Sequence, residues 1–178
     1  PGFVHSGSMP RSLPMQWIHT SGAGGWATEM TLDENGIPDT AAERVAIAEK
    51  ILKTAEEYGI EKKDIIFDTL AMAISADPNA AFATVNSLKE IKERLGCHTS
   101  LGVSNISFGL PLRPQVNQNF LTMAMVYGLD LPIINPNQKE MMDVLDACRV
   151  LSGEDVSCVS YIEHQSSMKQ EKKTASFV

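Results

Sequence analysis

Short apolar runs alternate with longer amphipathic segments between residues 31 and 151 of the chain. Runs of apolar residues begin near residues 65, 100 and 131, so consecutive starts lie 35 and 31 residues apart. That spacing is typical of strand–helix units whose strands pair in parallel. Each run is apolar almost throughout, as expected for strands that are covered on both faces. The pattern therefore predicts an α/β fold.

The segments between the apolar runs carry the start and stop signals of helices. Thr40 and Glu43 have capping-box spacing, and the helix that they begin is predicted to end at Gly59. Asp77 and Pro78 predict an N-cap and a first-turn proline for a second helix, which ends at Gly96. Two further helices are predicted over about 114–127 and from the Asn137/Glu140 capping pair to Leu151.

A further strand is predicted to end over residues 30–33, which gives four strand ends and four helices. This is half of an eightfold (β/α) barrel or most of a small doubly wound sheet. The predicted organisation is a non-family or disordered leader at 1–30, the α/β unit at 31–151, and a polar tail or linker at 152–178.

Composition narrows the partners and the compartment. The 178 residues suit one domain, and a formal charge of −7 argues against nucleic acid or an anionic membrane surface as a partner. Three cysteines, with no C-x-x-C pair, do not form a disulfide framework, and no apolar run reaches the length of a membrane span. We therefore expect a cytoplasmic protein.

Candidate chemistry lies where the apolar runs end, because parallel α/β folds place ligands at the carboxyl ends of their strands. The residues that end the four runs are Asp33, Asp68, Asn105 and Asn135. Asp and Asn are also common at such turns for a purely structural reason, because they cap the following loop. No histidine, lysine or G-x-S-x-G serine ends a strand, and no cluster of metal ligands is present in the sequence, so neither an activated nucleophile nor a metal site is predicted. Carboxylates and amides suit a neutral heterocycle that is rich in N–H donors.

The loop over residues 102–114 contains two glycines, two prolines and Arg113. Glycine, serine and arginine beside a helix start are also compatible with phosphate binding. An unrelated phosphate-binding α/β enzyme therefore stays open as an alternative.

The segment LGVSNISFGLPLRPQVNQNFLTMAMVYGLDLPIINPN (101–137) closely resembles the pterin-binding methyltransferases that act on methyltetrahydrofolate and a corrinoid. This family includes the methyltetrahydrofolate:corrinoid/iron-sulfur protein methyltransferase and the folate module of cobalamin-dependent methionine synthase. The upstream segments TLDENGIPDTAAERVAIAEKIL and DIIFDTL resemble the family in the same order. The G-V-S-N sequence with the downstream R-P is the most specific part.

The resemblance implies a (β/α)8 TIM barrel of the dihydropteroate synthase type, of which this chain would be the C-terminal half, with about the last four βα units. It implies that Asp68 hydrogen-bonds the pterin and that the catalytic Asn105 reaches N5, the atom that carries the methyl group. Gly102, Ser104 and Arg113 match the loop beside the pterin. Asp33 and Asn135 are further candidates.

The implied activity is methyl transfer from N5 of methyltetrahydrofolate to a corrinoid cobalt, a step of one-carbon metabolism. The D-x-H-x-x-G motif of corrinoid-binding modules is absent from the sequence, so the cobalamin would be carried by a partner protein or domain. No metal is expected on this chain itself, and the family implies a homodimer. The alternative from another class is a catalytically silent fragment whose open strand edges drive self-association.

Overall fold

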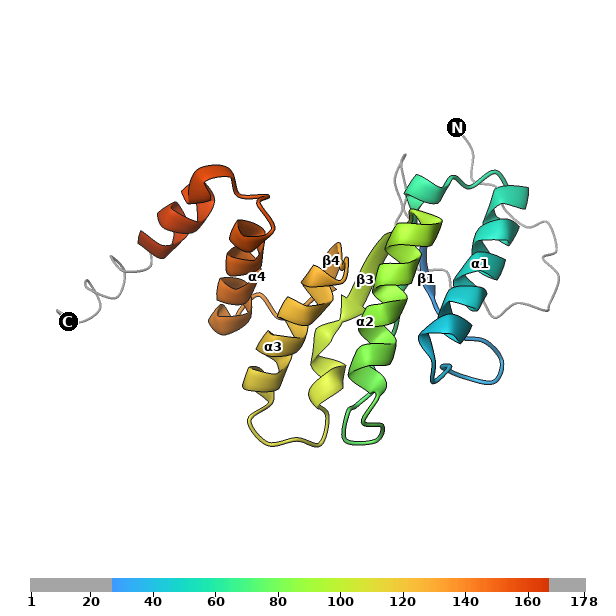
Figure 1. Cartoon of the computed structure of the whole chain (residues 1–178), viewed down its shortest axis with the longest axis horizontal. Coiled ribbons are helices and arrows are strands. Elements are labelled where there is room, and N and C mark those ends of the chain that lie inside the picture. The colour runs from blue at the N-terminus through green and yellow to red at the C-terminus, as the bar shows by residue number, and fades with distance from the viewer. Residues whose placement is uncertain (1–26, 167–178) are drawn as a thin grey trace.

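The computed structural model describes residues 27–166, which form a parallel four-stranded sheet with helices packed against it (Figure 1). The strands are paired in the order β1-β2-β3-β4, so each strand lies beside the one that precedes it in the chain. Their bounds are β1 (Ala27–Met30), β2 (Ile65–Asp68), β3 (His98–Gly102) and β4 (Leu131–Ile133). The predicted α/β class with parallel pairing is confirmed.

Four helices follow the four strands. Helix α2 continues into a wider π-helical turn (η2, Ile91–Leu95), and a 3₁₀ helix (η3, Val103–Ser107) follows β3 directly. The α-helices are α1 (Ala41–Glu57), α2 (Ala80–Glu90), α3 (Arg113–Val126) and α4 (Lys139–Leu151). In Figure 1, α2 and α3 lie in front of the strands. Right-handed crossovers in a sheet of sequential order place all helices on one face.

The core lies between this face and the helices. Ile65 and Phe67 of β2 pack with α1 and η2, whereas Leu101 of β3 packs with α2 and α3. Because successive side chains of a strand point to opposite faces, the residues between these positions face away from the helices. Met30, Asp68, Ser100 and Leu131 are paired with one another in register and form one row across this opposite face.

Of the three side-chain caps predicted at helix N-termini, one is formed as predicted, one is shifted and one is wrong. The Thr40 hydroxyl accepts the Glu43 N–H (3.3 Å) and Glu43 Oε2 accepts the Thr40 N–H (3.3 Å), which confirms the capping box. Helix α2 begins at Ala80 instead of at Pro78, but Asp77 Oδ1 still accepts the Asn79 N–H (2.9 Å). The predicted Asn137/Glu140 cap of α4 is wrong, because Gln138 occupies the N-cap and no side chain caps this helix.

The structure differs from the predicted boundaries at both ends. Strand β1 occupies residues 27–30, inside the predicted leader and three residues earlier than the predicted strand end, while residues 1–26 lie outside the described residues. The predicted polar tail begins with helical turns at 159–166, because Asp155 accepts the N–H groups of Ser160 (3.1 Å) and Tyr161 (2.9 Å). His164 contacts Asp146 of α4, which attaches these turns to the sheet-bearing unit. Residues 167–178 are outside the described range.

Among residues 27–166, none of the helices is long and apolar enough to cross a membrane.

Glu29 of β1 is a buried carboxyl group whose Oε1 has no hydrogen-bond partner among the described residues. It pairs in register with Phe67 and so shares the helix-facing side of the sheet. Burial raises the pKa of Glu29 from 4.5 to about 7, since the ionised form loses its hydration. Glu29 is therefore protonated in the folded protein at mildly acidic pH.

The substitution Glu29→Gln is expected to stabilise the protein at alkaline pH. A carboxyl whose pKa is raised by folding leaves stability intact below its unfolded pKa and lowers stability as pH rises through the folded value of about 7. Urea unfolding at pH 9 should show a gain of about 2 kcal/mol for the variant, and this gain should shrink toward zero at pH 4.5. A gain of equal size at both pH values would contradict the assigned cause.

Candidate functional site

The predicted site residues gather at one end of the sheet, where the strands have their carboxyl ends. Asp68 ends β2 and Gly102 ends β3, while Ser104 and Asn105 lie in η3 and Arg113 begins α3. The two loops that carry them are joined, because the Ile74 N–H donates to Ile106 O (2.9 Å) and the Ser75 hydroxyl donates to Phe108 O (2.7 Å). The loop after β2 and the loop after β3 therefore form one connected unit.

Of the four residues predicted to end strands, only Asp68 does so, and the other three lie two or three residues beyond a strand end. Three of the four use their side chains to hold their own turns. Asp33 Oδ1 accepts the Asn35 N–H (2.8 Å), Asp68 Oδ1 accepts the Leu70 N–H (2.8 Å) and Asn135 Oδ1 accepts the Asn137 N–H (3.0 Å). These bonds are the structural role that such residues commonly have at turns. Asn105 differs, since its amide is exposed and makes no hydrogen bond within residues 27–166 that would hold a turn. Its donor and acceptor are thus available to a ligand.

Asp68 combines a structural bond with an available oxygen. Its side chain is half-buried and belongs to the face of the sheet that points away from the helices. Burial raises the pKa of the Asp68 carboxyl, and the hydrogen bond from the Leu70 N–H partly opposes that rise. The carboxylate therefore sits where a ligand with N–H donors would stabilise its charge.

Ser100 is a residue of this region that sequence reasoning missed. It is the register partner of Asp68 on the same face, it is buried, and its hydroxyl has no hydrogen-bond partner among the described residues. The alternation of side chains along β3 places Ser100 and Gly102 together, and that alternation was the available signal. An apolar-looking run gave no reason to single out one serine.

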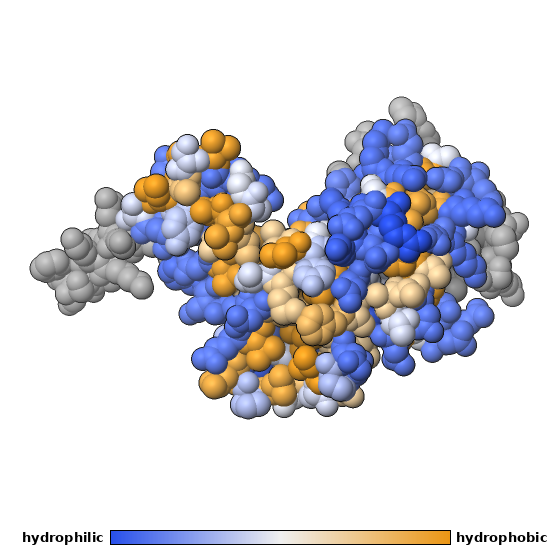
Figure 2. Space-filling model, in the orientation of Figure 1, coloured by the Kyte–Doolittle hydropathy of each residue, from blue (hydrophilic) through white to orange (hydrophobic). Residues whose placement is uncertain are grey.

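The side chain of Arg113 is directed into its own loop. Its Nη2 donates to Ser104 O (2.8 Å), its Nε donates to the Ser107 hydroxyl (3.0 Å), and the guanidinium lies 5.4 Å from the centre of the Phe108 ring. These contacts brace the segment that carries Asn105. Figure 2 shows apolar surface at this end of the molecule, where Phe108 and Leu112 are exposed.

Gly102 leaves the backbone open beside Asn105. A Cβ placed on Gly102 would lie 3.8 Å from Asn105 Nδ2, which is an ordinary contact, so the protein's own packing does not require glycine here. A missing side chain at a strand end lets a ligand approach the backbone closely.

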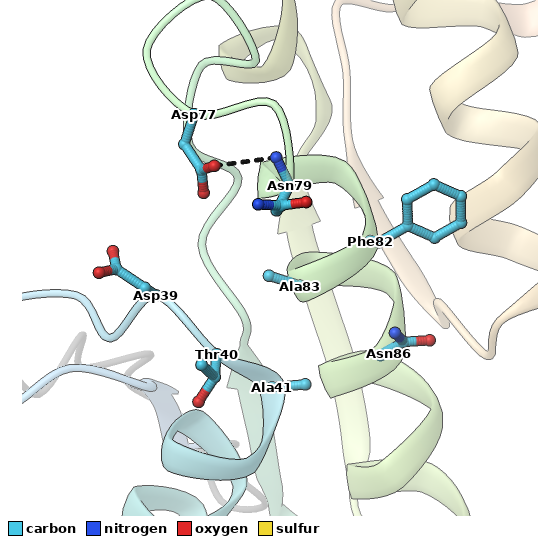
Figure 3. A pocket seen from close by; sticks show the side chains of 8 residues that line it. All are labelled: Asp39, Thr40, Ala41, Asp77, Asn79, Phe82, Ala83 and Asn86. Carbon is cyan, nitrogen blue, oxygen red and sulfur yellow. Dashed lines mark hydrogen bonds between the residues drawn. The ribbon is translucent and has the colours of Figure 1, made fainter.

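A cleft opens between the N-terminal ends of α1 and α2 (Figure 3), at the same end of the sheet. Its rim is acidic, since in Figure 3 Asp39 and Asp77 approach it from the two helix starts. None of the predicted site residues lines this cleft, so it is separate from the Asp68–Asn105 region. Its lining consists of Asp39, Thr40, Ala41, Asp77, Asn79, Phe82, Ala83 and Asn86.

Comparison with known proteins connects this arrangement with a family. The family model described as pterin binding enzyme matches residues 19–135, a range that includes Asp68, Gly102, Ser104, Asn105 and Arg113. This match begins upstream of the domain boundary predicted at residue 31.

Curated relatives share the same region. Methylcorrinoid:tetrahydrofolate methyltransferase of Eubacterium limosum is 33% identical over 135 residues, which cover 74% of this chain and 49% of that protein. Methionine synthase of Mycobacterium tuberculosis is 34% identical and that of Mycobacterium leprae is 31% identical, each over 117 residues that cover 61% of this chain and 10% of the relative. The chain spans about half the length of the first relative and about a tenth of the other two. It belongs to the pterin-binding enzyme family, as its resemblance to the methyltetrahydrofolate:corrinoid methyltransferases predicted.

Proposed function

We propose that this chain forms the pterin-holding part of a methyltransferase that moves a methyl group between N5 of tetrahydrofolate and a corrinoid carried by a partner protein or domain. The observation that carries the proposal is the pairing of Asp68 and Asn105 on adjoining loops at the carboxyl end of the sheet, inside the family-matched residues. The names of the relatives support the substrate class.

Asp68 holds the pterin in this proposal. A carboxylate accepts two parallel hydrogen bonds, and the pterin ring presents neighbouring N–H donors of that kind. Asp68 Oδ1 already accepts the Leu70 N–H (2.8 Å), which fixes the plane of the carboxylate before the ligand arrives. Ser104 and Gly102 line the same approach, and Arg113 keeps the loop in place through Ser104 O (2.8 Å).

Asn105 acts on the reacting atom. A methyl group leaves a tertiary amine poorly unless N5 gains positive character, and a hydrogen-bond donor that strengthens as charge redistributes lowers the barrier. The exposed amide of Asn105 supplies such a donor. As the N5–methyl bond breaks, N5 keeps the bonding electron pair and takes up a proton from water, while the Asn105 amide donates a hydrogen bond and keeps its own proton. The corrinoid supplies the nucleophile that receives the methyl group.

The strand order and the position of the core favour a barrel fold rather than a doubly wound fold. A doubly wound sheet reverses its strand order and carries helices on both faces, whereas this sheet runs in strict sequence with its core on one side. Strands in strict sequence are the arrangement of a (β/α)8 barrel, in which the face of Asp68 and Ser100 is the interior. We therefore propose that the whole protein completes the barrel with further strands and, like its family, works as a homodimer in the cytoplasm.

The proposal also includes the direction in which the methyl group moves. We favour methyltetrahydrofolate as the donor, whereas the name of the Eubacterium limosum relative describes transfer from a methylcorrinoid to tetrahydrofolate. The same donor at N5 serves both directions, since forward and reverse transfer share one transition state. Rates measured from each side with the same corrinoid partner would decide the direction.

The phosphate-binding enzyme and the silent self-associating fragment, the two alternatives from the sequence, receive less support. In the phosphate-binding alternative Arg113 would contact the phosphate, but its guanidinium already donates to Ser104 O and to the Ser107 hydroxyl of its own loop. Self-association of a silent fragment is compatible with the open sheet, and it predicts folding without any response to folate.

Thermal unfolding with and without excess methyltetrahydrofolate tests the proposed function. A ligand that binds only the native state at 100 times its Kd raises the apparent stability by about 2.7 kcal/mol. We expect an upward shift with methyltetrahydrofolate and none with a phosphorylated sugar. A cooperative transition that folate does not shift, together with concentration-dependent association in sedimentation, would instead favour the silent fragment.

A further inference from the structure

We propose that Arg44 is a positioning residue for the pterin site: from α1 it holds the turn after β2, and through that turn it orients the Asp68 carboxylate. The inference rests on the proposed function, in which Asp68 receives the pterin. It assigns a role to a side chain in the body of the fold that has no contact of its own with the candidate ligand.

Arg44 is almost fully buried, with 1% of its surface exposed. Its Nη1 donates to Thr69 O (2.8 Å) and to Leu70 O (3.0 Å), which are the two residues directly after Asp68. The same nitrogen lies 3.2 Å from the Thr84 hydroxyl of α2, and Nε donates to Pro38 O (2.8 Å). One guanidinium thus connects α1, the turn after β2 and α2.

The turn that Arg44 holds is conformationally unfavourable. Leu70 has a φ of 57°, in the left-handed region that a residue with a branched side chain rarely adopts. In this conformation the Leu70 N–H points back to Asp68 Oδ1 (2.8 Å), and its carbonyl points to Arg44. Strained residues of this kind persist only where their surroundings hold them, and they cluster at functional sites. Arg44 holds this turn through Thr69 O and Leu70 O, and the Thr84 hydroxyl, itself in contact with Arg44, also donates to Leu70 O (3.3 Å).

The chemistry of Arg44 is unusual for a residue that serves packing alone. A buried charge is costly unless it is paired, and Arg44 makes no salt bridge with a carboxylate among the described residues. Burial lowers the pKa of Arg44, while the negative charges of Asp39 and Asp77 act in the opposite direction and raise it. Its hydrogen bonds go to backbone carbonyls and one hydroxyl, and two of those carbonyls adjoin Asp68. The guanidinium fork matches this set of acceptors in a way that a lysine ammonium does not.

Arg44→Lys separates orientation from charge, because lysine keeps the positive charge but loses the fork. We expect faster hydrogen exchange at the Leu70 amide, by about tenfold or more, because its bond to Asp68 loosens. The Thr99 amide, which donates to Asp130 Oδ2 (3.1 Å), should keep its exchange rate and so report an intact fold. In calorimetry, methyltetrahydrofolate should bind the full chain about tenfold more weakly.

The pH profile supplies a readout that lost packing would not change. The Leu70 N–H lowers the pKa of Asp68, so loosening that bond raises it and moves the acid limb of folate binding to higher pH. The matched control is Arg94→Lys, since Arg94 is exposed and pairs with Glu49 and Glu90. That variant should retain the parent's affinity, profile and Leu70 exchange.

The outcomes distinguish a failure of the positioning role of Arg44 from a failure of the proposed function. If Arg44→Lys lowers the melting temperature but leaves Leu70 exchange, folate affinity and pH profile unchanged, Arg44 is structural only and the inference is wrong. If the parent chain does not bind methyltetrahydrofolate, the proposed function fails for this chain, and unchanged or accelerated exchange at Leu70 still decides whether Arg44 holds the turn. Should Arg44→Lys fail to fold, Arg44→Gln, which retains an amide donor, takes its place in the same measurements.

Discussion

Asp68→Ala is expected to weaken methyltetrahydrofolate binding by about 10²- to 10⁴-fold, because it removes two hydrogen bonds to a charged acceptor that contribute about 1.5–3 kcal/mol each. Calorimetric titration of the parent and the variant measures this loss. Asp68→Asn keeps the shape and one acceptor oxygen, so its loss should lie between those of the parent and the alanine variant.

Asp77→Asn is the matched control for Asp68. Asp77 also follows β2 in the chain and its Oδ1 also accepts an N–H two residues on (Asn79, 2.9 Å), but it lines the separate cleft between α1 and α2. Its replacement should leave folate affinity within about twofold of the parent. Equal losses for the two variants would mean that general damage to the loop, and not a ligand contact, weakens binding.

Folate binding should also depend on pH through Asp68. Burial raises the pKa of Asp68, and only the ionised carboxylate accepts two N–H bonds, so affinity should increase as pH rises through the pKa of the free protein. A bound ligand with N–H donors lowers that pKa again, and binding should therefore release protons from Asp68. In Asp68→Asn this part of the pH dependence should disappear.

The order and approximate position of the strands were predictable from the apolar pattern, although only β2 ends at its predicted residue, Asp68, and β3 ends at Gly102, three residues before Asn105. Apolar runs ended by Asp68 and Asn105 predicted parallel strands whose carboxyl ends meet, and the structure places both on joined loops. The Thr40/Glu43 capping box was equally local and is formed. A single sequence contains such information because each signal involves residues within a few positions of one another.

Long-range contacts were beyond the reach of the same reasoning. Arg44 bonds to residues 25 and 26 positions away, and nothing in its helix distinguishes it from a solvent-exposed arginine of an amphipathic segment. The helical turns at 159–166 depend on Asp155 and on the contact of His164 with Asp146, none of which gives a periodic apolar signal. Tertiary contacts decide these elements, so local pattern could not.

The strand-end residues also illustrate how a structure separates two meanings of one pattern. At Asp33 and Asn135 the side chain caps a turn, which is sufficient reason for an acceptor there. Asp68 caps its turn and retains a second oxygen, and Asn105 caps nothing among the described residues. The strand-end pattern alone presented four equivalent candidates, and the hydrogen bonds leave Asp68 and Asn105 with side-chain atoms that are available to a ligand.

Asn105→Ala is expected to slow methyl transfer by about 10²-fold while changing folate affinity much less, because the amide donor acts mainly as N5 loses the methyl group. Single-turnover transfer between methyltetrahydrofolate and a reduced corrinoid, in the complete protein, separates the two effects. Asn135→Ala is the control, since Asn135 also ends a strand region but uses its oxygen on the Asn137 N–H (3.0 Å). An unchanged transfer rate in Asn105→Ala would remove this residue from the mechanism, and a parallel loss of affinity and rate would make it a binding residue. Asn105→Asp tests the donor directly: it keeps the size but replaces the amide donor with a carboxylate, so it should be as slow as the alanine variant near neutral pH and recover only as pH falls and the carboxyl takes up a proton.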